Sequence, residues 1–263
     1  MLKVTELSRS FEDPGRGRVL AVDGLSFEVR RGEVYGLLGP NGAGKTTTLR
    51  LLATLLRPDR GTMNVDGVDA LTDPVGARAR LAYVPAEAGL PRELTGREAV
   101  TLFARVQGVA APKARADALL TTLGAAGFAD SPCGGLSTGQ KRRVVLARAL
   151  VHDPPVMLLD EPTDGLDVGG RREVLALVRR LAGEGRAILL SSHVMGEVEA
   201  VCDRAGVLAK GRLVAEGTLD QLRERAGKAD LSDAFLELVG EQQRARRQSM
   251  TVDEESKASE HDG

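Results

Sequence analysis

Hydrophobic and polar residues alternate in some parts of the chain and run together in others, and both patterns predict strands. Residues 25–30 place Leu25, Phe27 and Val29 on one face of a strand and polar side chains on the other. The largely apolar run at 33–38 lacks this alternation, which is typical of a strand buried on both faces. Further strands are predicted over residues 2–7, 81–84, 155–159, 186–191 and 204–208.

Helical spacing occupies most of the segments between these strands. Helices are predicted over residues 45–55, 168–181 and 193–201. Between about 86 and 151 strand signals nearly disappear, and three helical segments indicate an inserted helical lobe. Because strands and helices alternate on both sides of this lobe, we expect an α/β fold with a mostly parallel sheet covered by helices.

The composition narrows the function classes. With 42% hydrophobic and 28% charged residues, the 263-residue chain can bury a core. Its 36 basic and 37 acidic residues give a net charge of −1, so we expect no nucleic-acid partner. No apolar stretch is long enough to span a bilayer, and the first residues lack the apolar core of a secretory signal. Two cysteines, Cys133 and Cys202, fit a reducing, cytoplasmic compartment.

A glycine-rich loop lies between the strand at 33–38 and the next helix. It reads GPNGAGKT and fits the phosphate-binding pattern G-x-x-x-x-G-K-[ST] in the strand–loop–helix context that the pattern requires. Its glycines let successive backbone N–H groups point at one anion, and the start of the helix adds partial positive charge. Lys45 is expected to reach the β- and γ-phosphates, and Thr46 to ligate Mg²⁺. The nucleotide contacts predicted here are Gly39, Pro40, Asn41, Gly42, Ala43, Gly44, Lys45, Thr46 and Thr47.

Two carboxylates, Asp160 and Glu161, follow the strand predicted at 155–159. The carboxyl end of a parallel strand lies at the sheet edge where a phosphate loop begins. Asp160 can hold Mg²⁺ there, and Glu161 can polarise the water that attacks the γ-phosphate. Alone, such a pair would more often belong to a solvated loop, but together with the phosphate loop it predicts nucleotide hydrolysis.

Three further motifs narrow the class of hydrolase. The pentapeptide LSTGQ precedes a helix, which Ser137 can cap, and Gly139 permits close approach to a phosphate. TDGLD ends at Asp167, and Ser-Ser-His ends at His193 after a strand. In this order the motifs resemble the signature, the D-loop and the switch histidine of ATP-binding cassette (ABC) ATPases, with Thr138 at the usual first glycine of LSGGQ.

The resemblance covers about residues 1–225, with the helical lobe at about 86–151. It implies a P-loop NTPase core with a mostly parallel sheet, a small antiparallel β-subdomain and the inserted lobe. Beyond this domain we expect a C-terminal helix at 226–240 and a polar, disordered tail at 241–263.

The resemblance also implies how ATP and Mg²⁺ would be used. Two copies are expected to form a head-to-tail dimer that sandwiches each ATP between the phosphate loop of one chain and the signature of the other. The signature residues expected from the second chain are Ser137, Gly139 and Gln140, and Asp167 of the D-loop is also expected to contact the nucleotide. His193 would contact the γ-phosphate. Phe11 stands where the family carries an aromatic that stacks on adenine, and the alternative for this residue is a phenylalanine of the hydrophobic core.

One position departs from the family pattern. ABC ATPases usually carry a glutamine after the strand at 81–84, where it senses Mg²⁺ and the attacking water, but this chain has Ala86 followed by Glu87. Alanine can do neither, so either Glu87 takes over the contact or Mg²⁺ is held without it.

Several segments resemble one branch of the family, the ABC-2-type exporter ATPases, and within it the NatA-type sodium-extrusion subunits. They include DGLSF at 23–27, VYGLL at 34–38 and LSSHVM at 190–195. The implied partner is a separate integral-membrane permease, which the helical lobe would meet at the cytoplasmic face of the membrane. The implied cargo is Na⁺, while related branches export drugs, lipids or polysaccharides.

Two other classes stay open as alternatives. The first is a soluble ABC ATPase that acts on DNA ends or ribosomes. DNA-repair relatives insert a long coiled coil between phosphate loop and signature, whereas Gly44 and Ser137 are only 93 residues apart. Ribosomal relatives usually carry two cassettes, and this chain has one. The second class, a P-loop kinase or GTPase, would need neither the signature nor the switch histidine.

Overall fold

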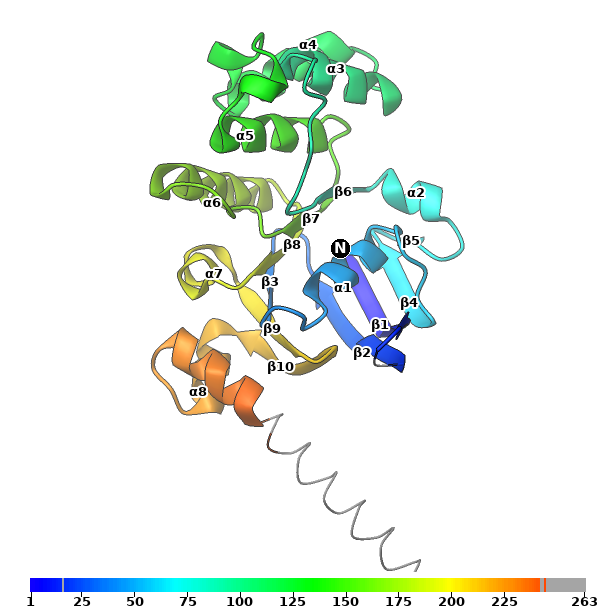
Figure 1. Ribbon diagram of the computed structural model, residues 1–263, viewed down its shortest axis with the longest axis vertical. Coiled ribbons are helices and arrows are strands. Elements are labelled where there is room, and N and C mark those ends of the chain that lie inside the picture. Colours follow the sequence, from blue (N-terminus) through cyan, green and yellow to red (C-terminus); the bar gives the residue numbers. More distant parts are fainter. Residues whose placement is uncertain (16, 242–243, 245–263) are drawn as a thin grey trace, which may run out of the picture.

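The computed structural model describes residues 1–15, 17–241 and 244, and contains two β-sheets with helices around them (Figure 1). The smaller sheet is antiparallel, in the order β2–β1–β4–β5. The larger has the order β10–β9–β3–β8–β7–β6, with every neighbouring pair parallel except β10 with β9. The strands are β1 (Leu2–Asp13), β2 (Gly17–Val29), β3 (Val34–Leu38), β4 (Arg60–Val65), β5 (Val68–Asp69), β6 (Leu81–Val84), β7 (Val156–Asp160), β8 (Ala187–Ser192), β9 (Arg204–Ala209) and β10 (Arg212–Thr218).

Helices lie on both faces of the larger sheet and form the separate lobe. They are α1 (Lys45–Leu52), α2 (Pro74–Arg78), α3 (Gly96–Val106), α4 (Pro112–Thr122), α5 (Thr138–Ala149), α6 (Val168–Gly183), α7 (Met195–Val201) and α8 (Leu219–Ala226), with short 3-10 turns η1 (Ala126–Phe128) and η2 (Cys133–Gly135). Residues 231–241 are also helical. None of the helices within the described ranges is long and apolar enough to cross a membrane.

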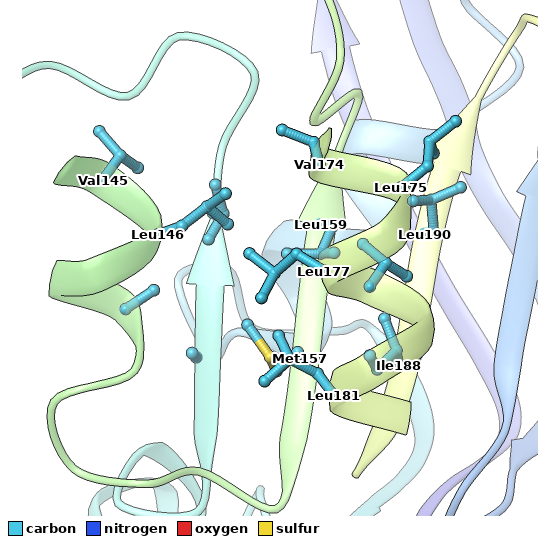
Figure 2. Packing of buried hydrophobic residues seen from close by; sticks show 14 of the residues in the cluster. Val145, Leu146, Met157, Leu159, Val174, Leu175, Leu177, Leu181, Ile188 and Leu190 are labelled. Carbon is cyan, nitrogen blue, oxygen red and sulfur yellow. The ribbon is translucent and has the colours of Figure 1, made fainter. Parts of the chain in front are cut away.

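Two hydrophobic cores lie on opposite faces of the larger sheet. Neighbouring residues of β7 alternate between them: Val156 and Leu158 pack in the core shared with α1 and the antiparallel sheet, whereas Met157 and Leu159 pack in the core shared with α6. Figure 2 shows Met157 and Leu159 beside Leu177 of α6. Because both faces are covered, every residue of β3, β7 and β8 is buried, which explains why these strands do not alternate in the sequence.

The helices α3, α4 and α5 form the lobe, which stands beyond the β6 edge of the larger sheet (Figure 1). Reciprocal side-chain caps begin two of them, with Thr95 and Glu98 at α3 and Ser137 and Gln140 at α5. Helix α5 contacts β6, so the lobe is joined to the sheet through the helix that follows the signature. The predicted fold class, with its parallel core, antiparallel subdomain and helical insertion, is confirmed.

The carboxyl ends of β3, β7 and β8 meet at one edge of the larger sheet. Asp160 at the end of β7 pairs with Ser191, and Leu38 at the end of β3 pairs with Ser192. The loops that follow these three strands therefore start side by side, although they lie far apart in the sequence. This register positions the site described below.

Several boundaries differ from those predicted. The β1 strand continues to Asp13 through register shifts. The first helix ends at Leu52 because Thr54 has a left-handed φ of 57°. Gly227, with φ 63°, ends α8, so the helix expected over 226–240 begins at residue 231. Of the expected tail at 241–263, all but residues 241 and 244 lie outside the described residues.

Candidate nucleotide-binding site

The phosphate loop leaves β3 and enters α1 between two other strands, and it needs glycine at both ends. A Cβ on Gly39 would lie 2.6 Å from the carbonyl oxygen of Leu208 in β9. Gly44 has φ 107°, and a Cβ there would lie 2.4 Å from the carbonyl oxygen of Ala21 in β2. The loop backbone is thus pressed against both sheets, with Asn41 and Gly42 exposed at its tip.

Lys45 begins α1 and is directed back into the loop. Its side chain is 5% exposed, and its Nζ donates hydrogen bonds to the carbonyl oxygens of Gly39 at 2.6 Å and Pro40 at 3.4 Å. The same Nζ lies 3.7 Å from Oε1 of Glu161. The next residue, Thr46, is exposed. A buried ammonium group and an exposed hydroxyl therefore stand side by side at the start of a helix, where an anion is favoured.

Asp160 is held in one orientation by groups on the neighbouring strands. It is 2% exposed, and its Oδ1 accepts a 2.6 Å hydrogen bond from the Ser191 hydroxyl. Its Oδ2 lies 3.5 Å from the Tyr83 hydroxyl of β6, which donates to it. Burial, together with the charge of Asp160, raises the pKa of Tyr83, so the phenol stays protonated and keeps donating.

Glu161 connects the phosphate loop to the switch histidine. Its backbone has a left-handed φ of 45°, which costs a non-glycine residue about 1–3 kcal/mol. Two hydrogen bonds from its backbone N–H, to the hydroxyl (3.1 Å) and the carbonyl oxygen (3.2 Å) of Ser191, hold this conformation. Its side chain then reaches Nδ1 of His193 with Oε2, at 2.7 Å. Lys45, Glu161 and His193, which lie in the segments after β3, β7 and β8, thus form one continuous cluster.

The signature lies away from this cluster, at the start of α5. The Ser137 hydroxyl accepts a hydrogen bond from the backbone N–H of Gln140 (3.3 Å), and Oε1 of Gln140 accepts one from the N–H of Ser137 (2.9 Å). Ser137 is exposed and Gly139 is half-buried. Within the described residues no hydrogen bond or ion pair joins the signature to the phosphate loop, so a single chain does not bring these two predicted halves together.

The D-loop lies beside the signature across a shared cleft. Asp167 caps α6 through a 2.7 Å hydrogen bond from the N–H of Gly170 and is exposed. A cleft of about 960 Å³ separates α5 from α6. Its lining includes Ser137, Gly139, Gln140 and Asp167. The three signature residues expected to act on a second chain's nucleotide and Asp167 of the D-loop therefore line one opening.

Phe11 lies in the antiparallel sheet, outside both hydrophobic cores. It pairs with Val19 of β2, its side chain is 37% exposed, and the guanidinium of Arg9 lies 5.0 Å from the centre of its ring. This exposure rules out the alternative of a core phenylalanine. Ala21, two residues beyond Val19, is the residue pressed against Gly44, so the Phe11 ring belongs to the part of the sheet beside the phosphate loop.

The segment that departs from the family pattern is held by a residue the sequence analysis missed. Glu87 is exposed, and it has no hydrogen bond or ion pair within the described part of the chain. Arg142 of α5 is 7% exposed and donates to the carbonyl oxygens of Pro85 (3.4 Å) and Ala86 (3.1 Å). Burial lowers the pKa of Arg142. Arg142 lies one helical turn before the buried Val145, and this spacing puts both residues on the inward face of α5. The same spacing is the feature of the sequence that could have identified Arg142.

A family model described as ABC transporter matches residues 22–164, from before the phosphate loop to the D-loop. Named relatives extend the similarity over most of the chain. Nod factor export ATP-binding protein I of Burkholderia orbicola (strain AU 1054) is 44% identical, over 83% of this chain and 73% of that protein. Daunorubicin resistance ATP-binding protein DrrA3 of Streptomyces coeruleorubidus is 43% identical, over 84% and 70%. ABC transporter ATP-binding protein NatA of Bacillus subtilis (strain 168) is 38% identical, over 90% and 97%.

Solved structures give the same result for the fold. The structure of an ATP-binding subunit of an ABC transporter superposes with a TM-score of 0.81 at 32% identity, over 90% of this chain and 99% of that one. A dimeric bacterial ABC transporter cassette superposes with a TM-score of 0.75 at 24% identity, over 83% and 98%, which supports the fold alone. The motifs, the sheet register and these similarities agree, and the chain belongs to the ABC transporter ATP-binding proteins as an ATPase of the ABC-2 exporter type.

Proposed function

We propose that this ATPase powers export through a separate integral-membrane permease at the cytoplasmic face of a membrane. The observation that carries the proposal is the cluster of Lys45, Glu161 and His193 at one sheet edge, because it joins a phosphate-binding group to a general base. The similarity to proteins of Nod factor export and daunorubicin resistance supports an export role.

In the proposed hydrolysis, each member of the cluster has one task. Lys45 exchanges its carbonyl partners in the loop for the β- and γ-phosphates, since a triphosphate offers an ammonium group stronger, charged acceptors. Glu161 accepts the proton of the attacking water. His193 keeps the Glu161 carboxylate aimed at that water through the 2.7 Å contact, and it would also contact the γ-phosphate.

Mg²⁺ is the metal that this site would take, and the donors present fit it. Asp160 offers a carboxylate fixed by Ser191, and Thr46 offers an exposed hydroxyl. Magnesium prefers such oxygen donors, with one or two protein groups and substrate phosphates completing its shell. When bound, Mg²⁺ would neutralise charge on the β- and γ-phosphates.

We also propose that a second copy completes the site. Ser137, Gly139, Gln140 and Asp167 line an exposed cleft at the starts of α5 and α6, where backbone N–H groups favour a phosphate. On the first chain, the exposed ring of Phe11 would stack on the adenine base. The two chains would then meet head to tail, with an ATP in each of the two shared sites.

The proposed cargo is Na⁺, on the strength of the sequence resemblance to sodium-extrusion subunits. Sodium uptake by inside-out membrane vesicles carrying the complex should require ATP and should stop with Glu161→Gln. Uptake of daunorubicin instead of Na⁺ would replace this cargo with a drug.

Glu87 is the candidate for the missing glutamine's role, so Glu87→Ala should weaken stimulation of the ATPase by the permease. An unchanged response would refute that role.

Purification of the tagged chain from a detergent extract tests the export proposal as a whole. We expect a multi-span membrane protein to co-purify, and to leave the complex when the helical lobe is deleted from the bait. Recovery of ribosomes or DNA in its place would favour the soluble ABC ATPases and contradict the proposal.

A further inference from the structure

A buried carboxylate behind the hydrolytic cluster takes no part in the chemistry described so far. Glu197 belongs to α7 and is 4% exposed. An ionised carboxylate is costly to bury unless hydrogen bonds and a cation compensate it. Glu197 has both, and its partners come from three other segments of the chain.

The two oxygens of Glu197 have separate partners. Oε2 accepts a 2.7 Å hydrogen bond from the hydroxyl of Thr163, which follows β7, and a 3.0 Å hydrogen bond from the hydroxyl of Ser192, the last residue of β8. Oε1 lies 3.2 Å from Nε of Arg171 in α6. The Ser192 hydroxyl also accepts a hydrogen bond from the N–H of Val194, at 3.0 Å. One buried group thus joins the loop after β7, the end of β8 and α6.

These partners are next to the residues proposed to hydrolyse ATP. Thr163 is two residues after Glu161, and Ser192 is immediately before His193. The side chains of Glu161 and His193 meet at 2.7 Å on the nucleotide side, while Thr163 and Ser192 share Glu197 on the buried side. The loop after β7 and the loop after β8 are therefore joined by two sets of contacts. One is the contact between Glu161 and His193, and the other is formed by the buried Glu197.

We propose that Glu197 is a positioning residue for ATP hydrolysis, which holds the loop after β7 and the switch histidine at one fixed spacing. Displacing a reacting group by about 1 Å can slow a reaction about 100-fold, so a brace of this kind affects turnover without touching the nucleotide. The phosphate loop has no bond to Glu197, and nucleotide affinity is therefore independent of it. The inference rests on the proposed roles of Glu161 and His193.

Kinetics of the purified chain test this inference with Glu197→Gln and Thr163→Val. Gln keeps the size of Glu197 but loses its charge, and Val keeps the shape of Thr163 but loses its hydroxyl. We expect each to lower kcat about 10- to 100-fold while the Kd for a fluorescent ATP analogue stays within about two-fold. Thr163→Ser, which restores the hydroxyl, should recover most of the turnover. Glu199→Gln on the same helix is the matched control, because Glu199 pairs with Arg223 on the surface and should leave kcat unchanged.

A double variant separates positioning from stability. In a His193→Ala background, Glu197→Gln should lower kcat by less than about three-fold, since the geometry it maintains is already lost. Wild-type kcat in folded Thr163→Val, or equal losses in Thr163→Val and Thr163→Ser, would overturn the inference. Failure of Glu161→Gln to lower turnover would instead overturn the proposed base, so the two failures can be told apart.

Discussion

The edge of the larger sheet, with Asp160 and Glu161, and the signature at the start of α5 differ in how far a single chain fixes their geometry. At the sheet edge, Asp160 and Glu161 are bound by Ser191, and Glu161 in turn contacts Lys45 and His193. At the signature, the exposed side chains of Ser137 and Asp167 cap α5 and α6, and among the described residues they form hydrogen bonds only within these helices.

This difference separates two tasks, which are the orientation of phosphates within one chain and contact with an anion from outside that chain. A buried, cross-linked edge can orient phosphates and a base within one chain. Exposed helix starts on either side of a cleft leave the N–H groups that their caps do not use accessible to an anion from outside. Substitutions at the edge should therefore act inside the chain that carries them, and substitutions at the signature should act on the other chain.

The largest effect is expected at the edge, from Glu161→Gln. The amide cannot accept the proton of the attacking water, so kcat should fall about 1,000-fold, within the range general bases contribute. Nucleotide binding should persist because the substitution leaves Lys45, the proposed partner of the phosphates, unchanged. Phosphate release and ATP-analogue fluorescence measure the two quantities. Turnover near the wild-type rate would remove Glu161 as the base.

Ser137→Arg is expected to act almost as strongly, but only in the assembly. The long side chain would fill the cleft at which we propose that the second chain's nucleotide binds, and turnover should fall about 100-fold. The Kd of a single chain for ATP should stay unchanged. Loss of the helix cap alone destabilises by about 1 kcal/mol, and the Tm of Ser137→Arg and of Ser137→Ala measures that loss separately from turnover. If the single-chain Kd of Ser137→Arg for ATP weakened in step with its turnover, damage within the chain rather than lost contact across the interface would explain the result.

Arg142→Met tests the contact between α5, which begins at the signature, and the segment after β6, and it should have a moderate effect on stability. It leaves the carbonyl groups of Pro85 and Ala86 without a donor, which should lower the free energy of unfolding by about 1–2 kcal/mol. Calorimetry should show a Tm lower by about 2–5 °C. Arg105→Met, an exposed change on α3, should leave Tm unchanged. A wild-type Tm in Arg142→Met would show that the loop does not depend on this guanidinium.

The smallest effect is expected from the protonation of His152, which lies between α5 and β7, and it should appear as a dependence of stability on pH. Its Nε2 bonds to the carbonyl oxygen of Leu81 at 3.1 Å, and its Nδ1 is buried without a partner, so burial lowers the pKa of His152. A lowered pKa in the folded state means that the unfolded chain binds more protons below about pH 6.5. Stability should be complete above that pH and decline as the pH falls through it. Urea unfolding from pH 7.5 to 5.5 should show a shallower decline in His152→Gln, and parallel declines would contradict this origin.

Contiguous motifs could be located from the sequence alone. The phosphate loop, the Asp160–Glu161 pair and the signature each fit within a few residues, because a backbone turn or a helix start needs its residues in succession. The fold class followed from the alternation of strands and helices, and the resemblance to ABC-2-type exporter ATPases is confirmed.

The groups that hold the site together could not be predicted in the same way. Ser191 matters because β7 and β8 pair Asp160 with it, and Arg142 because α5 packs beside the end of β6. Glu197 meets Thr163 only after α7 folds against the loop following β7. These contacts depend on sheet register and helix packing, which a linear pattern does not encode.

Mixing two inactive variants tests most directly whether one chain's signature completes the other's site. Lys45→Ala removes the phosphate-binding lysine and Ser137→Arg blocks the signature, so each variant alone should keep at most about a hundredth of the wild-type turnover. An equal mixture, exchanged before assay, should regain about a quarter of the wild-type turnover, since half of randomly paired dimers carry one intact shared site. Complete inactivity at every mixing ratio, with both variants folded and mixed dimers demonstrated, would contradict the account.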